Sequence, residues 1–384
     1  MKKVRMAIMG CGPRAQCLSE VYVNHPQLEI VAFCDTSKIL VDNLCGQYNQ
    51  KYNASAAAFT SYEDLLKGAS FDALFITSDP DCQVDYACDA MKRGLHVMTE
   101  VPAAYTLEQC RALVDTVKTT GAKYQLAEQT RYWNFIKNWR EMAAENKLGK
   151  IYYAEGEYLH YEPRWDYFIN VETGEHLWTD DASYLNNPLY RPSWRYRFFQ
   201  HPIYYLPHEL SPLLSITGGR IDKVSCQSTP KGSMGHEGFS EIRDMECALM
   251  HNENGVIFSL RAGFSVPFGP KNGTGAHWYQ VKGSKGCVEW ARSTIDQPKI
   301  WTIEDGWQAA GWTLEDTEAE EFIRNSSHGG ADYYPIDAFV SSILNDTTPP
   351  MDVYKAVESA APAIVAAQSA EQGGALLEVP NFRD

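Results

Sequence analysis

The stretch that decides the fold lies at the start of the chain and reads Val4-Arg5-Met6-Ala7-Ile8-Met9-Gly10-Cys11-Gly12-Pro13-Arg14-Ala15. An apolar strand runs directly into the pattern Gly-x-Gly-x-x-Ala. The first glycine permits a tight turn, the second lets backbone N–H groups approach a pyrophosphate, and the small third residue allows a helix to pack closely on the strand. The positive end of the helix dipole then faces the phosphates. This stretch therefore predicts a dinucleotide site that includes Gly10, Gly12, Pro13, Arg14 and Ala15.

An acidic residue supports this prediction. A second apolar run, from Ile30 to Cys34, ends in Asp35, about 20 residues beyond the glycines, where the ribose-binding acid of such a unit is found. A carboxylate there accepts hydrogen bonds from the adenosine ribose and repels a 2′-phosphate, so we expect NAD rather than NADP as the cofactor. The alternative is a glycine turn followed by an unrelated loop acid, but strand, glycines, helix and acid all stand in the expected order.

The first third of the chain continues this alternation of strands and helices. Strands are predicted at residues 71–77, 95–99 and 124–127, and helices at residues 107–119 and in a segment that ends at Met91. Such alternation predicts a parallel, doubly wound sheet, with ligands at the carboxyl ends of its strands. The cofactor-binding residues predicted at these ends are Thr77, Ser78, Glu100, Val101, Pro102 and Gln129. A cis peptide bond is expected before Pro102 because it would set a tight turn there.

The remainder of the chain has a different pattern. Residues 151–160, 224–229, 244–250, 256–264 and 277–281 read as strands with few helices between them, which predicts a mostly antiparallel open sheet. The predicted fold is thus an α/β Rossmann domain (residues 1–125) followed by an α+β domain for substrate binding and oligomerisation (residues 126–384). Residues 161–207 are rich in Trp, Tyr and Arg. They are predicted to form an ordered, irregular loop that serves the site, covers a sheet face or forms a subunit interface.

Composition excludes several classes of function. The 384 residues carry a net charge of −15, which argues against a nucleic-acid partner. No apolar stretch approaches the length of a membrane helix, and none resembles a signal peptide. The ten cysteines are scattered, and several, including Cys34, Cys247 and Cys287, lie in apolar strand-like runs. We interpret them as reduced core thiols of a cytoplasmic protein.

The tripeptide Glu100-Val101-Pro102 follows the fifth predicted strand. Together with the glycine pattern and the large antiparallel sheet, it resembles the Gfo/Idh/MocA oxidoreductase family over essentially the whole chain. Dehydrogenases of that family carry a lysine where this chain has Val101, and the lysine helps to deprotonate the substrate hydroxyl. Because a valine side chain cannot transfer a proton, the resemblance implies that another group must take this role.

Further stretches resemble the NAD-dependent glycoside hydrolases of family 109. They are Glu100-Val101-Pro102-Ala103-Ala104, Leu126-Ala127-Glu128-Gln129-Thr130-Arg131-Tyr132, Ala154-Glu155-Gly156-Glu157-Tyr158, Tyr205-Leu206-Pro207-His208, His328-Gly329-Gly330-Ala331-Asp332-Tyr333 and Asp352-Val353-Tyr354. The chain departs from the family at residues 201–204 and at Glu209, which replaces a small residue. Because these departures fall where the substrate would be read, specificity for N-acetylgalactosamine is not implied.

The resemblance implies a redox-neutral mechanism in which NAD⁺ takes a hydride from C3 of a sugar, the aglycone is eliminated, water adds and the hydride returns. In this mechanism His208 is the candidate base at the C3 hydroxyl, and its ordinary pKa near neutrality suits that task. Tyr158 is the candidate for the C2 proton, although a phenol needs a nearby positive charge to act as a base. Tyr205 could protonate the leaving oxygen or bind the substrate, and Glu128 could orient the sugar or act as an acid. The alternative for all four is a purely structural role.

Two other functions remain open at this point: an NAD-dependent sugar dehydrogenase that uses His208 as its base, and a non-catalytic NAD- or sugar-binding regulator. Arg191, Arg195 and Arg197 could clamp a substrate or pair with carboxylates. No metal site is expected, because His201 and His208 lack a third ligand at a suitable spacing. The expected partners are a small carbohydrate and, through the open sheet, further copies of the chain in a homodimer or homotetramer.

Overall fold

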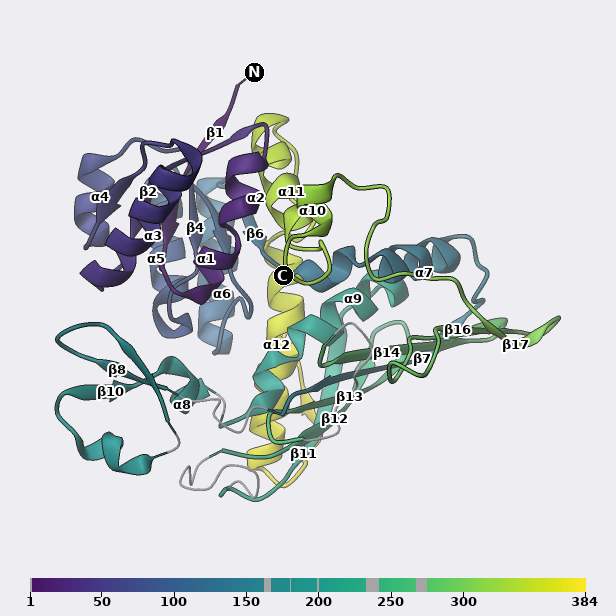
Figure 1. Cartoon of the computed structure of the whole chain (residues 1–384). Helices are drawn as coiled ribbons and strands as arrows, with labels where there is room; N and C mark the ends of the chain where they lie inside the picture. Colours follow the sequence, from purple (N-terminus) through teal and green to yellow (C-terminus); the bar gives the residue numbers. More distant parts are fainter. Residues whose placement is uncertain (1, 162–166, 180, 199, 233–241, 267–274) are drawn as a thin grey trace.

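The computed structural model describes residues 2–161, 167–179, 181–198, 200–232, 242–266 and 275–384 (Figure 1). The N-terminal part is a six-stranded sheet in which every pair is parallel. In spatial order its strands are β3 (Ala57–Phe59), β2 (Leu28–Cys34), β1 (Val4–Met9), β4 (Ala73–Ile76), β5 (His96–Thr99) and β6 (Tyr124–Leu126). The predicted doubly wound sheet is confirmed, and so are its strands at residues 71–77, 95–99 and 124–127.

Helices cover both faces of this sheet. They are α1 (Pro13–Cys17), α2 (Ser19–Asn24), α3 (Lys38–Tyr52), α4 (Tyr62–Gly68), α5 (Pro80–Lys92) and α6 (Leu107–Thr120). The predicted helix at residues 107–119 is α6, which begins with a capping box at Thr106 and ends at Gly121 in the left-handed conformation. One face of β1 packs on α1 to α3 and also on α11 (Tyr333–Leu344), so an element from the end of the chain completes the N-terminal core.

The C-terminal part is built on a nine-stranded sheet. In spatial order its strands are β17 (Gly306–Ala309), β16 (Lys299–Thr302), β15 (Gly286–Glu289), β14 (His277–Gly283), β7 (Ile151–Leu159), β13 (Ile257–Gly263), β12 (Glu246–Asn252), β11 (Ile221–Ser228) and β18 (Leu377–Glu378). Only the β7–β13 pair is parallel, so the prediction of a mostly antiparallel sheet is confirmed.

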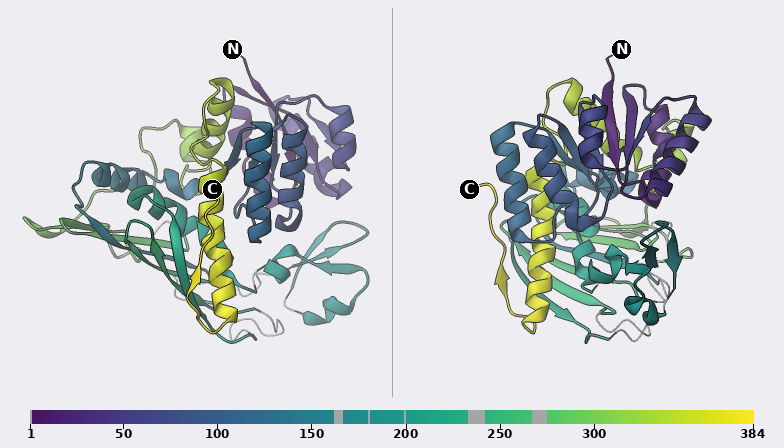
Figure 2. Two further views of the ribbon diagram at one scale, coloured as in Figure 1. Left: turned by 180° about the vertical axis from the view of Figure 1, so that it is seen from behind. Right: turned by 90° about the vertical axis from the view of Figure 1, so that its left-hand side faces the viewer.

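One face of the large sheet is covered and the other is open. The covered face packs on α9 (Pro207–Thr217) and α12 (Val353–Glu371), and α12 runs between this sheet and the N-terminal domain (Figures 1 and 2). On the open face, β12 alternates buried and exposed residues, and Leu249 is 58% exposed. Helix α7 (Asn134–Ala144) packs beside α9, and the short helix α10 (Glu321–Arg324) contacts α2.

The aromatic segment contains a small sheet, which corrects the prediction of an irregular loop. Strands β8 (Tyr167–Asn170), β9 (His176–Trp178) and β10 (Tyr190–Pro192) pair antiparallel in the order β10-β8-β9. Strands of three or four residues are too short to show a period of two in the sequence. The segment continues through the short helices η2 (Ala182–Asn186), α8 (Trp194–Phe198) and η3 (Pro202–Tyr205). Figure 2 shows the part that contains β8, β9, η2 and β10 beside the main body, and we call residues 167–192 the flap.

The ten cysteines are all free thiols, and their burial partly differs from the prediction. Cys34 is buried as expected, but Cys287 is only partly buried and Cys247 is exposed. Cys247 lies at an outward position of β12, whose alternation places every second residue on the open face. Within the described ranges, no helix is both long and apolar enough to cross a lipid bilayer.

Candidate active site

The loop after β1 provides open space for a ligand. Gly10 has a φ of +99°, and a Cβ added there would fall 2.5 Å from the backbone nitrogen of Ser78, so only glycine fits. A Cβ added at Gly12 would meet no heavy atom within 4 Å, and Pro13 begins α1 at this point. Ala15 is fully buried, as close packing of helix on strand requires. Open space in front of a helix N-terminus fits the pyrophosphate of a dinucleotide.

Asp35 and Thr77 hold this loop from two neighbouring strand ends. The Asp35 carboxylate accepts hydrogen bonds from the backbone N–H groups of Cys11 at 2.7 Å and Ser37 at 2.8 Å. The Thr77 hydroxyl donates to the carbonyl of Gly10 at 2.7 Å. Asp35 therefore stands beside the glycine loop, at the position expected for a ribose-binding acid, whereas the side chain of Thr77 stabilises the loop itself.

Arg14 joins the glycine loop to the C-terminal half. Its Nε lies 2.7 Å from Glu100, and its two terminal nitrogens lie 3.0 and 2.9 Å from the two carboxylate oxygens of Asp332. Burial alone would raise the pKa of Asp332, but the charge of Arg14 and the hydrogen bond from His328 together hold that pKa well below its usual range. Asp332 is thus ionised, and Arg14 is engaged in a bidentate ion pair.

Side-chain hydrogen bonds from helix α5 hold the turn that follows β5. The Val101–Pro102 peptide bond is cis, as predicted. The buried side-chain amide of Gln83 donates to the carbonyls of both Glu100 and Pro102 at 2.9 Å. Val101 packs partly buried against the main core, so the position that carries a lysine in related dehydrogenases is apolar here.

Glu128 and Gln129 carry buried polar atoms that face this region. Glu128 is fully buried, and its Oε1 accepts hydrogen bonds from the N–H of Thr130 at 3.1 Å and from its hydroxyl at 2.7 Å. Glu128 Oε2 and Gln129 Oε1 are buried and have no hydrogen-bond partner among the described residues. Both residues lie just after β6, where η1 (Gln129–Tyr132) begins. Unsatisfied acceptors at a strand end are suited to a polar ligand.

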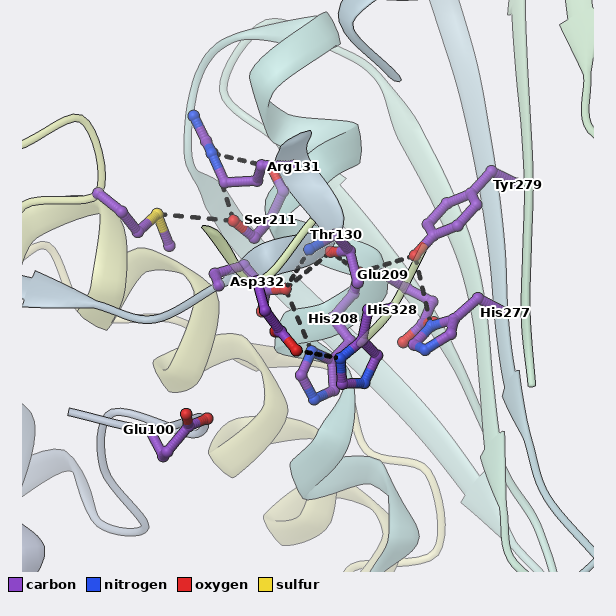
Figure 3. Close-up of polar contacts among 12 residues, drawn as sticks. Glu100, Thr130, Arg131, His208, Glu209, Ser211, His277, Tyr279, His328 and Asp332 are labelled. Carbon is purple, nitrogen blue, oxygen red and sulfur yellow. Dashed lines mark hydrogen bonds and ion pairs between the residues drawn. The ribbon is translucent and has the colours of Figure 1, made fainter. Parts of the chain in front are cut away.

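Three of the predicted catalytic side chains meet above the large sheet. His208 lies near the start of α9, and its Nδ1 is 3.1 Å from Glu128 Oε1 (Figure 3). The Tyr158 ring stacks on the Tyr205 ring with centroids 5.8 Å apart, and it lies 5.4 Å from the His208 ring. Each of the three residues is 8% exposed. The structure therefore brings His208, Tyr158, Tyr205 and Glu128 together.

The tyrosines of this group are weak acids. Burial raises the pKa of Tyr158 well above its ordinary value, and Arg195 acts in the opposite direction. The Arg195 guanidinium lies 5.3 Å from the ring centre of Trp178 and 5.7 Å from that of Tyr167, both in the flap. Arg195 therefore supplies positive charge near Tyr158 while it rests on aromatic faces. Arg191 approaches Asp79 at 3.8 Å, and the side chain of Arg197 lies outside the described residues.

A second carboxylate–imidazole pair lies beneath the first, and the sequence did not reveal it. Glu209 Oε1 lies 2.5 Å from His277 Nδ1, and the Glu209 side chain is fully buried above Gly156 of β7. Burial and then the charge of Glu128 raise the pKa of Glu209, and burial lowers the pKa of His277 well below its ordinary value. Both groups are therefore neutral, with the carboxylic acid donating to Nδ1. The His277 ring lies 4.8 Å from the Tyr158 ring, so this pair adjoins the candidate catalytic side chains.

This pairing predicts different outcomes for two substitutions. Glu209→Gln is also neutral and can donate to His277, so it should fold normally. Its stability relative to wild type should rise as the pH increases above about 4.3, because only the wild-type side chain ionises on unfolding. Glu209→Ala leaves a cavity and removes the nearest hydrogen-bond partner of His277, and it should cost about 2–4 kcal/mol. Denaturant midpoints at several pH values measure both effects. A glutamine variant as unstable as the alanine variant would show that Glu209 is ionised in the fold.

His328 is a further imidazole near the site. It belongs to a stretch of sequence that resembles family 109, but that resemblance predicted no role for this residue. Its Nδ1 lies 3.0 Å from Asp332 Oδ2, which also accepts a hydrogen bond from Ser327 Oγ at 2.6 Å. Its backbone is left-handed, with φ of +55°, and its carbonyl accepts a hydrogen bond from Trp133 Nε1 at 2.8 Å. The His328 side chain is 38% exposed, so it can reach a ligand.

His201 does not approach the site. Its two ring nitrogens lie 2.8 Å from Glu246, at the start of β12, and 3.1 Å from Glu371, at the end of α12. Among the residues whose placement is described, no group of three or more His, Cys, Asp or Glu side chains is arranged to hold a metal ion.

Two family comparisons agree with this architecture. Residues 4–128 match the oxidoreductase family with an NAD-binding Rossmann fold, GFO_IDH_MocA, and residues 278–384 match the C-terminal domain of glycosyl hydrolase 109. The match over residues 4–128 places the N-terminal domain in the Gfo/Idh/MocA oxidoreductase family, as the sequence predicted, and the chain is an enzyme. Along its entire length the chain is similar to glycosyl hydrolase family 109 proteins.

The individual proteins that match the chain are glycosyl hydrolases by sequence and oxidoreductases by structure. The chain is 25% identical to glycosyl hydrolase family 109 protein 5 of Phocaeicola vulgatus, over 100% of this chain and 78% of that protein. It is 28% identical to an alpha-N-acetylgalactosaminidase of Shewanella oneidensis, over 45% of this chain and 39% of that protein. Among solved structures, the fold resembles an Agrobacterium radiobacter oxidoreductase in complex with NAD⁺, L-tartaric acid and magnesium, with a TM-score of 0.75 and 12% identity over 98% of both chains. The fold also resembles scyllo-inositol dehydrogenase of Lactobacillus casei with bound NAD(H) and scyllo-inositol. The TM-score is 0.70 and the sequence identity is 17%, over 98% of this chain and 99% of that chain.

Proposed function

We propose that the chain is an NAD-dependent glycoside hydrolase that oxidises C3 of a sugar transiently, eliminates the aglycone, adds water and reduces C3 again. The observation that carries the proposal is the convergence of His208, Glu128, Tyr158 and Tyr205 in one place, with apolar Val101 at the turn after β5. The full-length similarity to family 109 proteins supports it. The open glycine loop, Asp35 and the unsatisfied oxygens of Glu128 and Gln129 fit a bound dinucleotide.

Bound NAD would supply the hydride acceptor for C3 and would return the hydride at the end of the cycle. The chain's own task in that step is to remove the proton of the C3 hydroxyl, and His208 is the group that does so. Because Glu128 holds Nδ1, the ring presents Nε2 as the proton acceptor. The adjacent carboxylate also stabilises the imidazolium that forms.

Tyr158 removes the C2 proton, which a neighbouring C3 ketone makes more acidic. Its buried phenol is a poor base on its own, and Arg195 is the cation that favours the phenolate. Tyr205 stacks on Tyr158 and binds a sugar hydroxyl with its own phenol group. Neither step requires two carboxylates on opposite sides of the glycosidic bond.

The test is a screen of aryl glycosides of both anomers against enzyme loaded with NAD⁺ and enzyme stripped of it. The expected result is aglycone release by the loaded enzyme only, without net change in nicotinamide absorbance and with solvent deuterium entering C2 of the product. Equal cleavage by the stripped enzyme, or a product free of deuterium, would overturn the proposal.

An NAD-dependent sugar dehydrogenase is the second candidate, because the fold resembles inositol dehydrogenases and the His208–Glu128 pair could serve oxidation alone. In that case, NADH would accumulate in proportion to the sugar consumed. We also propose that the open face of the large sheet associates with further copies of the chain.

Asp35 should set both the affinity and the choice of cofactor. Asp35→Ala removes the ribose acceptor and should weaken NAD binding by roughly 10–100-fold, since hydrogen bonds to a charged group contribute about 1.5–3 kcal/mol each. NADP should be discriminated less strongly, because the repulsion of its 2′-phosphate is lost. Isothermal titration with each dinucleotide measures this. Asp42→Ala, an exposed carboxylate on α3, is the control and should bind like wild type. Unchanged NAD affinity in Asp35→Ala would contradict the assignment.

A further inference from the structure

His328 is the most accessible imidazole of the site. Its carbonyl contacts Trp133, whose ring packs on His277, and the His277 ring lies 5.7 Å from the His208 ring, so His328 adjoins the candidate catalytic side chains. Its side chain is 38% exposed, whereas the side chains of His208 and His277 are 10% and 7% exposed. Figure 3 shows His328 beside its Asp332 partner, with Glu100 on the far side. The exposed part of the His328 ring is therefore open to a ligand.

Two separate anchors fix His328 in this position. On the cofactor side, Asp332 binds Nδ1 and is itself held by Arg14, which follows the glycine loop. On the sheet side, the His328 carbonyl is held by Trp133, whose ring packs edge-on against His277 with centroids 5.1 Å apart. The residue thus lies between the two binding regions.

The backbone of His328 points to the same conclusion. A histidine with φ of +55° is followed by Gly329 at +62° and Gly330 at +84°. A left-handed residue other than glycine is strained and persists where surrounding contacts enforce it, often at functional sites. Here the contacts to Asp332 and Trp133 enforce it.

We propose that His328 donates the proton to the glycosidic oxygen as the aglycone leaves; this role rests on the glycoside hydrolase function proposed above. Asp332 occupies Nδ1 at 3.0 Å, which leaves Nε2 of the partly exposed ring as the nitrogen that can pass a proton to a ligand. Tyr205 is a poorer donor, because burial raises the pKa of its phenol above the ordinary value.

The step balances as follows. Tyr158 takes the C2 proton, and the electron pair of that C–H bond forms the C1–C2 double bond of a 3-keto sugar. The C1–O bond breaks, its electron pair stays on the oxygen, and that oxygen takes the Nε2 proton of His328. In the hydration step water adds to C1 and gives its proton to Nε2, while Tyr158 returns a proton to C2. His328 is thereby restored to the imidazolium.

The experiment uses full-length, NAD-loaded enzyme with para-nitrophenyl, phenyl and methyl glycosides of one accepted sugar. In His328→Asn, the amide tolerates the left-handed backbone and can still donate to Asp332, but Nε2 is lost. Cleavage of the methyl glycoside should fall about 100–1,000-fold, and that of the para-nitrophenyl glycoside less than about tenfold, because a good leaving group needs little protonation. Deuterium should still exchange into C2.

Two further variants make the test decisive. His328→Gly keeps the left-handed turn, and added imidazole should restore methyl glycoside cleavage in it. His251→Asn alters another imidazole held at Nδ1 by a carboxylate, Asp222 at 2.8 Å on the open sheet face, and should behave like wild type. If His328→Asn lost cleavage rate equally with all three glycosides, or lost none, the proposed role of His328 would be overturned while the hydrolase function would stand. Wild-type enzyme that releases no aglycone from any glycoside would overturn the hydrolase function itself, and this inference with it.

Discussion

Replacing His208 by alanine should reduce glycoside turnover by about 10²–10⁴-fold, the usual contribution of a positioned general base. The bound nicotinamide should then remain oxidised when substrate is added, because the first proton transfer fails. Glu128→Gln should cause a smaller loss, since the amide can still hold the ring but cannot stabilise the imidazolium. Single-turnover absorbance and aglycone release measure both effects.

The control for these variants is a histidine away from the site. His251→Ala removes an exposed imidazole on β12, and its turnover should match that of wild type. Equal amounts of bound NAD in all variants would show that the cofactor site is intact. Turnover by His208→Ala within a few-fold of wild type would refute the assignment of His208 as the base.

Asp332→Asn should be among the most destabilising single substitutions in the chain, at about 3–5 kcal/mol, because it leaves Arg14 without its main charged partner. The pKa of Asp332 is lowered in the fold, so its stabilising effect is complete at neutral pH and declines as the pH falls below about 3.9, the unfolded value. The difference in the free energy of unfolding between wild type and Asp332→Asn should therefore become smaller as the pH falls. Denaturant midpoints between neutral pH and about pH 3 measure this trend.

Asp42→Asn supplies the comparison. This carboxylate pairs with Lys38 on the exposed surface of α3, and its loss should change stability little at any pH. A difference between Asp332→Asn and wild type that stayed constant down to the lowest pH would mean that the ion pair with Arg14 is not its source.

Most of the fold could be predicted from the sequence because its signals are local. The strand before Gly10, the acid at Asp35 and the alternation of residues 151–160 each lie within one short window. The helix at residues 107–119 was equally clear, since its capping residue and its terminal glycine are adjacent to it. The three-strand flap was missed because its pairs are too short for a periodic pattern.

The site could be predicted only in part. His208 and Glu128 were found through motifs, yet their contact joins residues 80 positions apart. Glu209 follows His208 directly, but one step along a helix turns a side chain by about 100 degrees, so Glu209 contacts β7 and pairs with a different residue. Its pairing with His277 and the position of His328 depend on tertiary contacts that no local pattern contains.

Helix α11 has a consequence for how the protein is made. Its Ile336, Phe339 and Val340 pack into the same apolar cluster as β1, although they follow β1 at a long distance in the sequence and are synthesised well after it. A nascent chain that ends after β6 lacks α11, so part of the apolar sheet face at β1 is exposed to solvent. We expect such a fragment to require chaperone protection during translation and to aggregate when it is expressed alone.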